Sequence, residues 1–527
     1  MGRAICPLLA LIALANQTQA SAQDCNCDQQ LGLDVTRFDG QDAGVSPGDR
    51  ICVMAGERPF LRFSNLAGTE EAPLTIVNCG GRVRIHNTDR AYALVFEADS
   101  KHFHITGTGD PSYTYGFDIS APAREPYAAV GLALIGRATN YEVDHLEIHD
   151  TGFAGISAKT DPLCNGSADQ DVFVQRDIDL HHLWVHDTGG EGFYVGSTQS
   201  NGQSITCDGA NELHQPHFLE GVSIHDNLVE DTGWDGMQVG MARSNCAVYR
   251  NIIRHVGLAA VDQQQQGLQI GTYSACAVYD NLISDGPAMG IIVLGGGSTQ
   301  IYNNLIVDFP EADSIYANQR DQVPTAEYHI AFNTLVNWGR NGITIFGAQL
   351  GPSSARSNLL VGPGQGVSAG SDVPFTAEHN LVLNDSTGVF RSSTDFHLAQ
   401  NSPALGQGTT VDGIPNDLDG VARAEPPAVG AYEWAEPGQD SAPPETGGEQ
   451  AAAAAGTTGG TVAGAAGGGG ARGGSGGDTT VSSRPTNEAL QGSGCQAASE
   501  SAGPPGSLWL GIGLGLLVWR RLRLRAT

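Results

Sequence analysis

Apolar and polar residues alternate along the middle of the chain in short runs of three to five residues. Ile343-Thr344-Ile345-Phe346 is one such run, and Leu268-Gln269-Ile270 is another. Alternation with a period of two puts every second side chain on the same face of a strand, whereas an amphipathic helix needs a period near 3.6 over ten or more residues. The pattern therefore predicts many short β-strands with one buried face each.

One phrase recurs between Tyr141 and Gly362: an Asn, an apolar pair, a polar turn, and a Gly that opens a second apolar run. Its copies begin 23 to 30 residues apart, which indicates stacked coils with two or three strands each. We expect the Asn side chains to form an internal ladder that hydrogen-bonds the turns, because buried polar groups need partners. The copies begin at Asn227, Asn251, Asn281, Asn304, Asn333 and Asn358.

Aligning the coils on the Gly that opens the second run separates inward from outward positions. The first and third residues after this Gly are apolar in every aligned coil, so we expect them to fill the core. These pairs are Ile156/Ala158, Phe193/Val195, Met237/Val239, Leu268/Ile270, Ile291/Val293 and Ile343/Ile345.

The outward polar positions beside the same Gly predict a candidate site. Glu191 precedes the Gly in one coil and Asp235 precedes it in the next, and parallel strands lie about 4.8 Å apart, so the two carboxylates should stack. Lys159 and Arg243 follow the corresponding strands and complete the set of candidate catalytic residues. The flanking residues expected to bind substrate are Tyr194, Gln238, Gln266 and Gln269.

Two stacked carboxyl groups have three possible chemistries. They could share a proton as general acid and base, approach the ~5 Å spacing of a retaining glycosidase pair, or hold Ca²⁺ as metal ligands through their oxygens. In a lyase, Ca²⁺ would bridge Glu191 and Asp235 to a uronate while Lys159 or Arg243 removes the proton next to its carboxylate. In the alternative, both carboxylates are solvated turn residues without a chemical role.

The charge balance restricts the partners. The chain carries 57 acidic and 27 basic residues, a formal net charge of −30. An acidic surface repels nucleic acid and other polyanions, so no nucleic-acid partner is expected. A polyanionic substrate would need a local cation.

Residues 1–22 are expected to form a secretory signal peptide. Arg3 supplies the positive start, Leu8 to Ala15 is a short apolar run, and Ala20-Ser21-Ala22 has the small-x-small pattern of a cleavage site. Export makes disulfides possible. A zinc site is the alternative use of the cysteines, but no Cys-x-x-Cys spacing is present.

Six of the cysteines can be assigned to pairs. Cys246 and Cys276 begin near-identical phrases, so stacking of the coils should bring them together. The partners of Cys25 and Cys27 are left open. The expected disulfides are Cys52–Cys79, Cys164–Cys207 and Cys246–Cys276.

Short motifs stand at both ends of the region 40–435. Ser46 to Gly56 and Gly68 to Asn78 contain Pro-Gly-Asp, Ala-Gly and Gly-Thr turns, and the C-terminal motifs are Asp395-Phe396-His397-Leu398, Asn401-Ser402-Pro403-Ala404-Leu405, Asp417-Leu418-Asp419-Gly420 and Val429-Gly430-Ala431-Tyr432-Glu433. The region resembles the right-handed parallel β-helix repeat family of secreted bacterial proteins. The resemblance implies an all-β, pectate-lyase-like, single-stranded right-handed parallel β-helix, with a cap and first coils in residues 23–100 and the β-helix in residues 101–435. This fold hosts lyases, hydrolases, epimerases and non-catalytic surface proteins, so it does not fix an activity.

The C-terminal part has a different composition. Residues 436–506 are rich in Gly, Ala, Ser, Thr and Pro and predict a disordered linker. Residues 507–527 are expected to form a short hydrophobic helix followed by arginines, the pattern of a membrane anchor with its positive end inside. The arrangement resembles the C-terminal sorting tag of myxobacterial surface proteins, which implies processing near Cys495 and display on the cell surface. A retained anchor is the alternative.

These observations lead to two functional hypotheses. In the first, an exported, surface-anchored monomer acts on an extracellular polysaccharide as a lyase or glycoside hydrolase. In the second, a non-catalytic surface protein binds glycan, adheres to another cell or has a structural role. A groove that holds Glu191 and Asp235 would favour the first, and a flat ladder with both side chains in solvent would favour the second.

Overall fold

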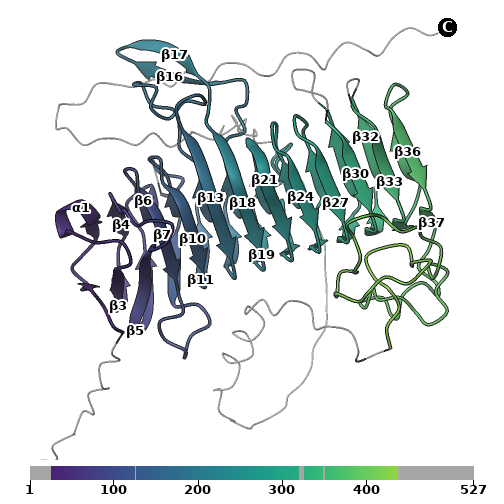
Figure 1. Ribbon diagram of the computed structural model, residues 1–527, viewed down its shortest axis with the longest axis horizontal. Coiled ribbons are helices and arrows are strands. Elements are labelled where there is room, and N and C mark those ends of the chain that lie inside the picture. Colours follow the sequence, from purple (N-terminus) through teal and green to yellow (C-terminus); the bar gives the residue numbers. More distant parts are fainter. Residues whose placement is uncertain (1–24, 125, 320–325, 348–349, 437, 439–527) are drawn as a thin grey trace, which may run out of the picture.

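The computed structural model describes residues 25–124, 126–319, 326–347, 350–436 and 438. Within these residues the chain winds into coils that stack along one axis, from the coils around β3 and β5 at one end to β36 and β37 at the other (Figure 1). The expected signal peptide, Cys495, the hydrophobic segment 507–527 and nearly all of the linker lie outside the described residues.

Three parallel sheets run along the stack, and a full coil contributes one strand to each. Sheet 1 contains β1 (Gln29–Leu31), β3 (Arg50–Arg58), β5 (Leu74–His86), β7 (Lys101–Thr106), β10 (Thr139–Asp144), β13 (Val174–His181), β18 (Phe218–His225), β21 (Ala242–Tyr249), β24 (Cys276–Tyr279), β27 (Thr299–Tyr302), β30 (Tyr328–Ala331), β33 (Ser353–Arg356) and β36 (Phe375–Glu378). Sheet 2 contains β8 (Phe117–Ala121), β11 (Leu146–Thr151), β14 (Trp184–Thr188), β19 (Leu228–Thr232), β22 (Ile252–Arg254), β25 (Leu282–Ser284), β28 (Leu305–Phe309), β31 (Thr334–Trp338), β34 (Leu359–Val361) and β37 (Leu381–Leu383). Sheet 3 contains β2 (Arg37–Asp39), β4 (Leu61–Ser64), β6 (Tyr92–Glu97), β9 (Val130–Leu134), β12 (Ile156–Ala158), β15 (Phe193–Val195), β20 (Met237–Val239), β23 (Leu268–Ile270), β26 (Ile291–Val293), β29 (Ile315–Asn318), β32 (Asn341–Phe346) and β35 (Gln365–Ala369).

Sheets 1 and 2 join at the N-terminal end, because the long strand β5 pairs with β7 through its first half and with β8 through its second. An antiparallel hairpin, β16 (Gln203–Cys207) and β17 (Ala210–His214), projects from one coil. Among the described residues the only helix is the four-residue α1 (Gly40–Ala43). No helix in this part of the chain has the length and apolar character to cross a membrane.

The core lies between the three sheets and confirms the predicted inward positions. All twelve residues of the six inward pairs have no exposed surface. Between Tyr141 and Gly362 the alignment nevertheless missed one coil, in which β29 lies between β26 and β32 and contributes Ile315 and Ala317. Ser314 occupies the position of the marker glycine in that coil, so an alignment on Gly passes over it.

The predicted asparagine ladder is present. Asn251 donates from Nδ2 to Oδ1 of Asn281 over 3.0 Å, and Asn281 donates in the same way to Asn304 over 2.9 Å. Each amide also donates to a backbone carbonyl, as Asn281 does to Val248 in the preceding coil. All six predicted asparagines are buried, and the ladder continues to Asn380. The amides therefore satisfy the turn between sheets 1 and 2 in the coils from Asn227 to Asn380.

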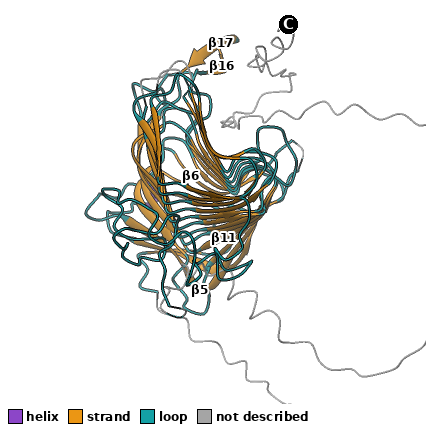
Figure 2. Ribbon diagram, turned by 90° about the vertical axis from the view of Figure 1, so that its right-hand side faces the viewer, coloured by secondary structure: helices purple, strands orange, loops and turns teal. Residues whose placement is uncertain are grey.

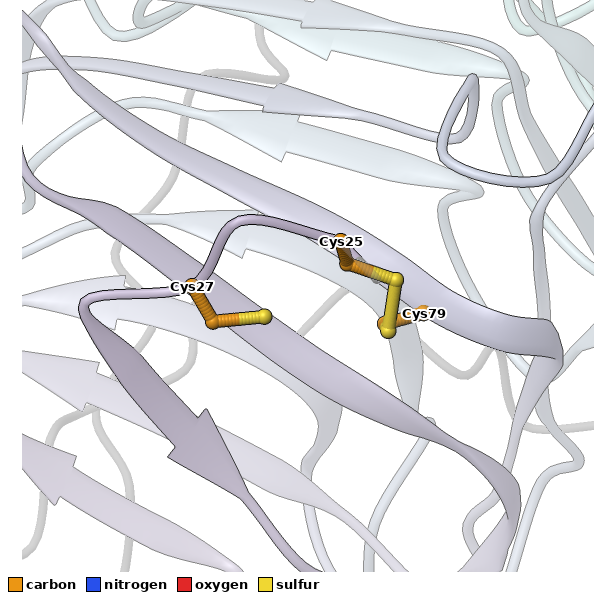
Figure 3. Close-up of side chains that lie close together, drawn as sticks. All are labelled: Cys25, Cys27 and Cys79. Carbon is orange, nitrogen blue, oxygen red and sulfur yellow. A yellow bond between two sulfur atoms is a disulfide. The ribbon is translucent and has the colours of Figure 1, made fainter. Parts of the chain in front are cut away.

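Four disulfides lie within the described residues, and one predicted pair is wrong. Cys164–Cys207 and Cys246–Cys276 are confirmed. Cys52 and Cys79 do not pair with each other: Cys25 bonds to Cys79, as Figure 3 shows, and Cys27 bonds to Cys52. The cause is the register of β3 and β5, in which Cys79 lies opposite Met54 and Cys52 lies opposite Val77. Because of this offset Cys52 and Cys79 do not lie opposite each other. Each of them bonds instead to one cysteine of the N-terminal segment.

The segment that follows β37 packs against the outer face of sheet 2 in the last coils. Val389, Leu398 and Val429 form one buried cluster with Leu305 and Leu359. The backbone N–H of residue 430 donates to the carbonyl of residue 357 over 2.8 Å. The C-terminal motifs found in the sequence thus cover the apolar side of the last coils.

The first prediction concerns the asparagine ladder. In Asn281→Ala, the backbone N–H of Asn251 loses its acceptor and its Nδ2 group loses one of three acceptors. The carbonyls of residues 248 and 279 lose the Nδ2 donor of Asn281. Leaving buried donors unsatisfied costs about 1–3 kcal/mol each, so we expect the free energy of unfolding to fall by about 2–4 kcal/mol in denaturant titrations. The exposed Asn201→Ala is the control, and equal stability of the two variants would contradict the ladder's role.

The second prediction concerns the N-terminal disulfides. Peptides of the unreduced protein should contain the links Cys25–Cys79 and Cys27–Cys52. Mass spectrometry with backbone fragmentation can distinguish Cys25 from Cys27 within one peptide. Detection of a Cys52–Cys79 link would overturn the observed register at this end of the stack.

Candidate functional site

Glu191 and Asp235 occupy equivalent positions in neighbouring coils, just before β15 and β20. The backbone shows this directly, because the N–H of residue 192 donates to the carbonyl of Asp235 over 3.2 Å. The same position in a later coil is Asp313, followed by Asn341, whose Nδ2 bonds to Oγ1 of the outward residue Thr344 over 3.1 Å. This position therefore belongs to the outer face of sheet 3, as the sequence predicts.

The structure excludes the alternative in which the two carboxylates are solvated turn residues. Glu191 is 2 % exposed and Asp235 has no exposed surface. The chain between β22 and β23 lies beside Asp235: its N–H groups at residues 257 and 259 donate to the carbonyls of Trp234 and residue 233. The backbone N–H of Gln266 then donates to Oδ1 of Asp235 over 2.8 Å. These bonds hold a long turn against the carboxyl group.

Two aromatic residues meet beside the pair, and the sequence did not single them out. The rings of Phe153 and Trp234 are edge to face, with centroids 5.5 Å apart, and the ring of Phe153 also contacts Tyr194 at 6.1 Å. Gly190 lies between them in the stack, where a Cβ would come within 2.7 Å of the Phe153 ring. A glycine is therefore needed immediately before Glu191.

Burial controls the protonation of the pair. Oε2 of Glu191 and Oδ2 of Asp235 are out of solvent and have no hydrogen-bond partner. Desolvation raises the pKa of Glu191 to about 7, against the opposing effect of the nearby Lys159 ammonium. Desolvation also raises the pKa of Asp235 well above its usual range, and the charge of Glu191 adds to that shift. Near neutral pH the site therefore holds protons on carboxyl groups.

The structure brings Lys159 to this site and leaves Arg243 elsewhere. The Lys159 ammonium lies 4.8 Å from the centre of the Tyr194 ring and donates to Asp161 over 2.8 Å. Arg243 lies on β21 in sheet 1, where its Nε donates to Glu220 over 2.7 Å and its guanidinium stacks on the ring of Phe218. Of the two candidate cations, Lys159 is the one that lowers the pKa of Glu191.

The three candidate glutamines are largely engaged with the protein itself. Gln269 donates from Nε2 to Oε1 of Gln238 over 2.6 Å, and both side chains are buried. The side chain of Gln266 bonds to the backbone of residues 263 and 265. Tyr194 is half-buried, and its hydroxyl lies 3.0 Å from Oγ1 of Thr198. Of the four predicted substrate-binding residues, Tyr194 retains the largest accessible surface.

The coil that the alignment missed has a third carboxylate, Asp313, at the position equivalent to Glu191 and Asp235. Asp313 is almost fully buried, its Oδ2 accepts from Nη2 of Arg340, and its Oδ1 accepts from the N–H of Asn341. Burial raises the pKa of Asp313, and Arg340 opposes that shift. An alignment of the coils on either Gly or Ser includes this coil, and so identifies Asp313 from the sequence.

The donor set around Glu191 and Asp235 fits a proton-holding pair better than calcium. Ca²⁺ takes six to eight oxygen ligands and would have to displace protons from both carboxyl groups. The Lys159 ammonium, close enough to lower the pKa of Glu191, would also repel a cation there.

Comparisons with known proteins agree with the fold. Residues 205–384 match the family model described as the right handed beta helix region, so this segment is a right-handed parallel β-helix. Among curated proteins, none matches the chain.

Several solved structures are similar to this chain, all at low sequence identity. Pectate lyase Pel9A is 14 % identical, with a TM-score of 0.41 and coverage of 75 % of this chain and 90 % of its own. The GH136 lacto-N-biosidase from Eubacterium ramulus is 14 % identical, with a TM-score of 0.43; the match covers 64 % of this chain but only 62 % of that protein. The A-module of the mannuronan C-5 epimerase AlgE4 from Azotobacter vinelandii is 15 % identical, with a TM-score of 0.35 and coverage of 65 % and 92 %.

The third prediction follows from the raised pKa of Glu191. The folded protein keeps a proton on Glu191 up to about pH 7, whereas the unfolded chain loses it near 4.5. The wild type should therefore lose stability as pH rises from 4.5 to 7, and Glu191→Gln should remove this loss. The difference in unfolding free energy between the two should shift by about 3 kcal/mol in favour of the variant over that range.

Denaturant titrations at several pH values measure this effect, with the exposed Glu71→Gln as the control. A pH-independent difference between Glu191→Gln and the wild type would show that Glu191 titrates normally.

Proposed function

We propose that this protein is an exported, surface-anchored carbohydrate-active enzyme that acts on an extracellular polysaccharide, as a lyase or a glycoside hydrolase. The observation that carries the proposal is the pair of adjacent buried carboxyl groups, each with one oxygen that lacks a hydrogen-bond partner. A buried carboxyl oxygen without a hydrogen-bond partner costs stability. Carboxyl groups whose pKa is strongly shifted by burial occur preferentially at functional sites.

The proposed chemistry is general acid and base catalysis by the pair. With a pKa of about 7, Glu191 can both donate and accept a proton near neutral pH. Equivalent positions in adjacent coils lie about 4.8 Å apart, close to the ~5 Å that separates the carboxyl groups of a retaining glycosidase. In a hydrolase, the protonated group would protonate the leaving glycosidic oxygen, and its ionised partner would attack or stabilise the sugar.

A lyase would use the same groups differently. The ionised carboxylate would remove the proton next to the uronate carboxylate, and the protonated group would donate to the leaving oxygen. The Lys159 ammonium would then attract the uronate charge. It is engaged with Asp161, so we assign it a binding role and leave proton abstraction to the carboxylates.

Access to the pair requires a change in the outer surface. The turn between β22 and β23 is hydrogen-bonded along residues 232–234, beside Asp235. A bound glycan would have to displace this turn or the rings of Phe153 and Trp234. Those rings could then stack on the sugar.

A second candidate function is non-catalytic glycan binding or adhesion. It is favoured by the nearly complete burial of the pair and by the Gln238–Gln269 hydrogen bond, which closes part of the outer face. In that case Glu191 and Asp235 would form a protonated row that joins neighbouring coils. Export, anchoring through residues 507–527, processing near Cys495 and a monomeric state belong to both proposals.

The fourth prediction separates these functions. A panel of extracellular polysaccharides, with and without Ca²⁺, is assayed for unsaturated products by ultraviolet absorbance and for reducing ends. Cleavage of one glycan should fall by at least about 100-fold in Glu191→Gln and in Asp235→Asn, while Glu71→Gln retains wild-type activity. Retention on a glycan column without product from any glycan would support the binding function, and activity that survives both substitutions would remove this pair from the mechanism.

A further inference from the structure

A second group of titratable side chains lies on the outer face of sheet 1, away from the Glu191–Asp235 pair. Parallel stacking of β10, β13 and β18, visible side by side in Figure 1, places imidazoles and carboxylates from three coils together. Asp179 and His181 are two residues apart on β13 and share one face. His225 on β18 lies opposite His181, and Glu142 on β10 lies opposite Asp179.

The side chains converge closely enough to bind one ion. One ligand atom each from Asp179, His181 and His225 lie within 4.8 Å of one another. Nε2 of His225 is 3.1 Å from Oδ1 of Asp179, and Nε2 of His181 is 3.1 Å from Oε1 of Glu142. Two ligands of a tetrahedral zinc ion, each about 2.0–2.1 Å from the metal, lie about 3.3 Å apart, so small movements would bring these atoms onto one ion.

One oxygen of the group lacks a satisfactory partner. Oδ1 of Asp179 is out of solvent and makes no hydrogen bond, although His225 Nε2 is 3.1 Å away. The two atoms are thus close without the alignment of a hydrogen bond. A cation between them would take the place of a proton on Nε2 of His225 and would bind both atoms.

The surroundings of His225 orient one ring nitrogen toward the site. Its Nδ1 lies 2.6 Å from Oδ2 of Asp226, and Asp226 is held by Nε and Nη2 of Arg250 at 2.7 and 2.6 Å. Nε2 is then the nitrogen that faces Asp179. A carboxylate bound to the far nitrogen of a histidine is the usual support of a metal-ligating imidazole, because it fixes the tautomer and the ring orientation.

A stack of rings fixes the neighbouring histidine as well. The rings of His181 and His225 are parallel, with centroids 4.8 Å apart, and the ring of Tyr249 continues the stack beyond His225 at 4.7 Å. Nδ1 of His181 lies 2.7 Å from Nδ1 of His182. Because His181 and His225 are each held in one orientation, little side-chain entropy would be lost when a ligand binds.

We propose that Asp179, His181 and His225 form a binding site for a divalent transition-metal ion of the Zn²⁺ class, with Glu142 as a fourth ligand. Two imidazoles with one or two carboxylates suit zinc and its neighbours in the first transition series. Calcium and magnesium prefer oxygen ligands alone and fit this donor set poorly. The site lies on a different sheet from Glu191 and Asp235 and does not depend on the proposed enzymatic function.

The fifth prediction tests this site with zinc alone. The full-length protein is treated with chelator, dialysed and titrated with Zn²⁺ by calorimetry, and Co²⁺ is used to obtain the visible absorption of a coordinated ion. We expect one equivalent of Zn²⁺ to bind, and the double variant His181→Ala/His225→Ala to lose it. The matched control is His149→Ala/His186→Ala, which removes another stacked pair, 5.2 Å apart, from sheet 2.

A milder variant distinguishes loss of a metal ligand from a folding defect. Asp226→Asn retains all the proposed ligands and should weaken Zn²⁺ binding by about 10- to 100-fold. Absence of stoichiometric Zn²⁺ binding by the wild type, or equal binding by the two double variants, would overturn the proposal. Circular dichroism of each variant confirms that the β-helix is intact.

Discussion

The in-register pairing of neighbouring coils is the constraint on which the rest of the structure depends. Each strand of the three sheets pairs in parallel with its counterpart about 4.8 Å away, so a side chain at one position of a coil must lie beside the same position of the next. The buried asparagines reinforce this register, since each amide bonds to the amide of the following coil and to the backbone of the preceding one. Figure 2, turned by 90° from Figure 1, shows the strands of successive coils lying over one another. Any chemistry in the stack is therefore built from rows of equivalent positions.

The repeated part of the fold could be predicted because its information is local. The inward pairs, the asparagine ladder and the Cys246–Cys276 disulfide all follow from aligning one coil on another. The failures occur where a coil departs from the repeat. Ser314 replaces the marker glycine and concealed Asp313, and the long strands β3 and β5 pair with an offset that separates Cys52 from Cys79. The packing of the last motifs on sheet 2 involves residues far apart in sequence, which a periodic pattern does not describe.

The candidate site was predicted in position but not in environment. Alternation correctly places Glu191 and Asp235 in adjacent coils on the outer face of sheet 3. Their burial depends on tertiary contacts, because the long turn between β22 and β23 is hydrogen-bonded beside Asp235 and the N–H of Gln266 donates to its carboxylate. The position of Arg243 likewise depends on its partner Glu220, which lies on the neighbouring strand β18. Burial changes the chemistry, because a solvated pair would be ionised at neutral pH, whereas this one keeps protons.

The most direct test of this account is the titration of Glu191 itself. Carbon-13 NMR of glutamate side chains, with Glu191→Gln to assign the resonance, follows the carboxyl group of Glu191 through the pH range. A buried, proton-holding group predicts a midpoint near pH 7 in the folded protein. A midpoint near the ordinary glutamate value of 4.5 would contradict the account, because Glu191 would then be fully ionised at neutral pH and burial would not control its protonation.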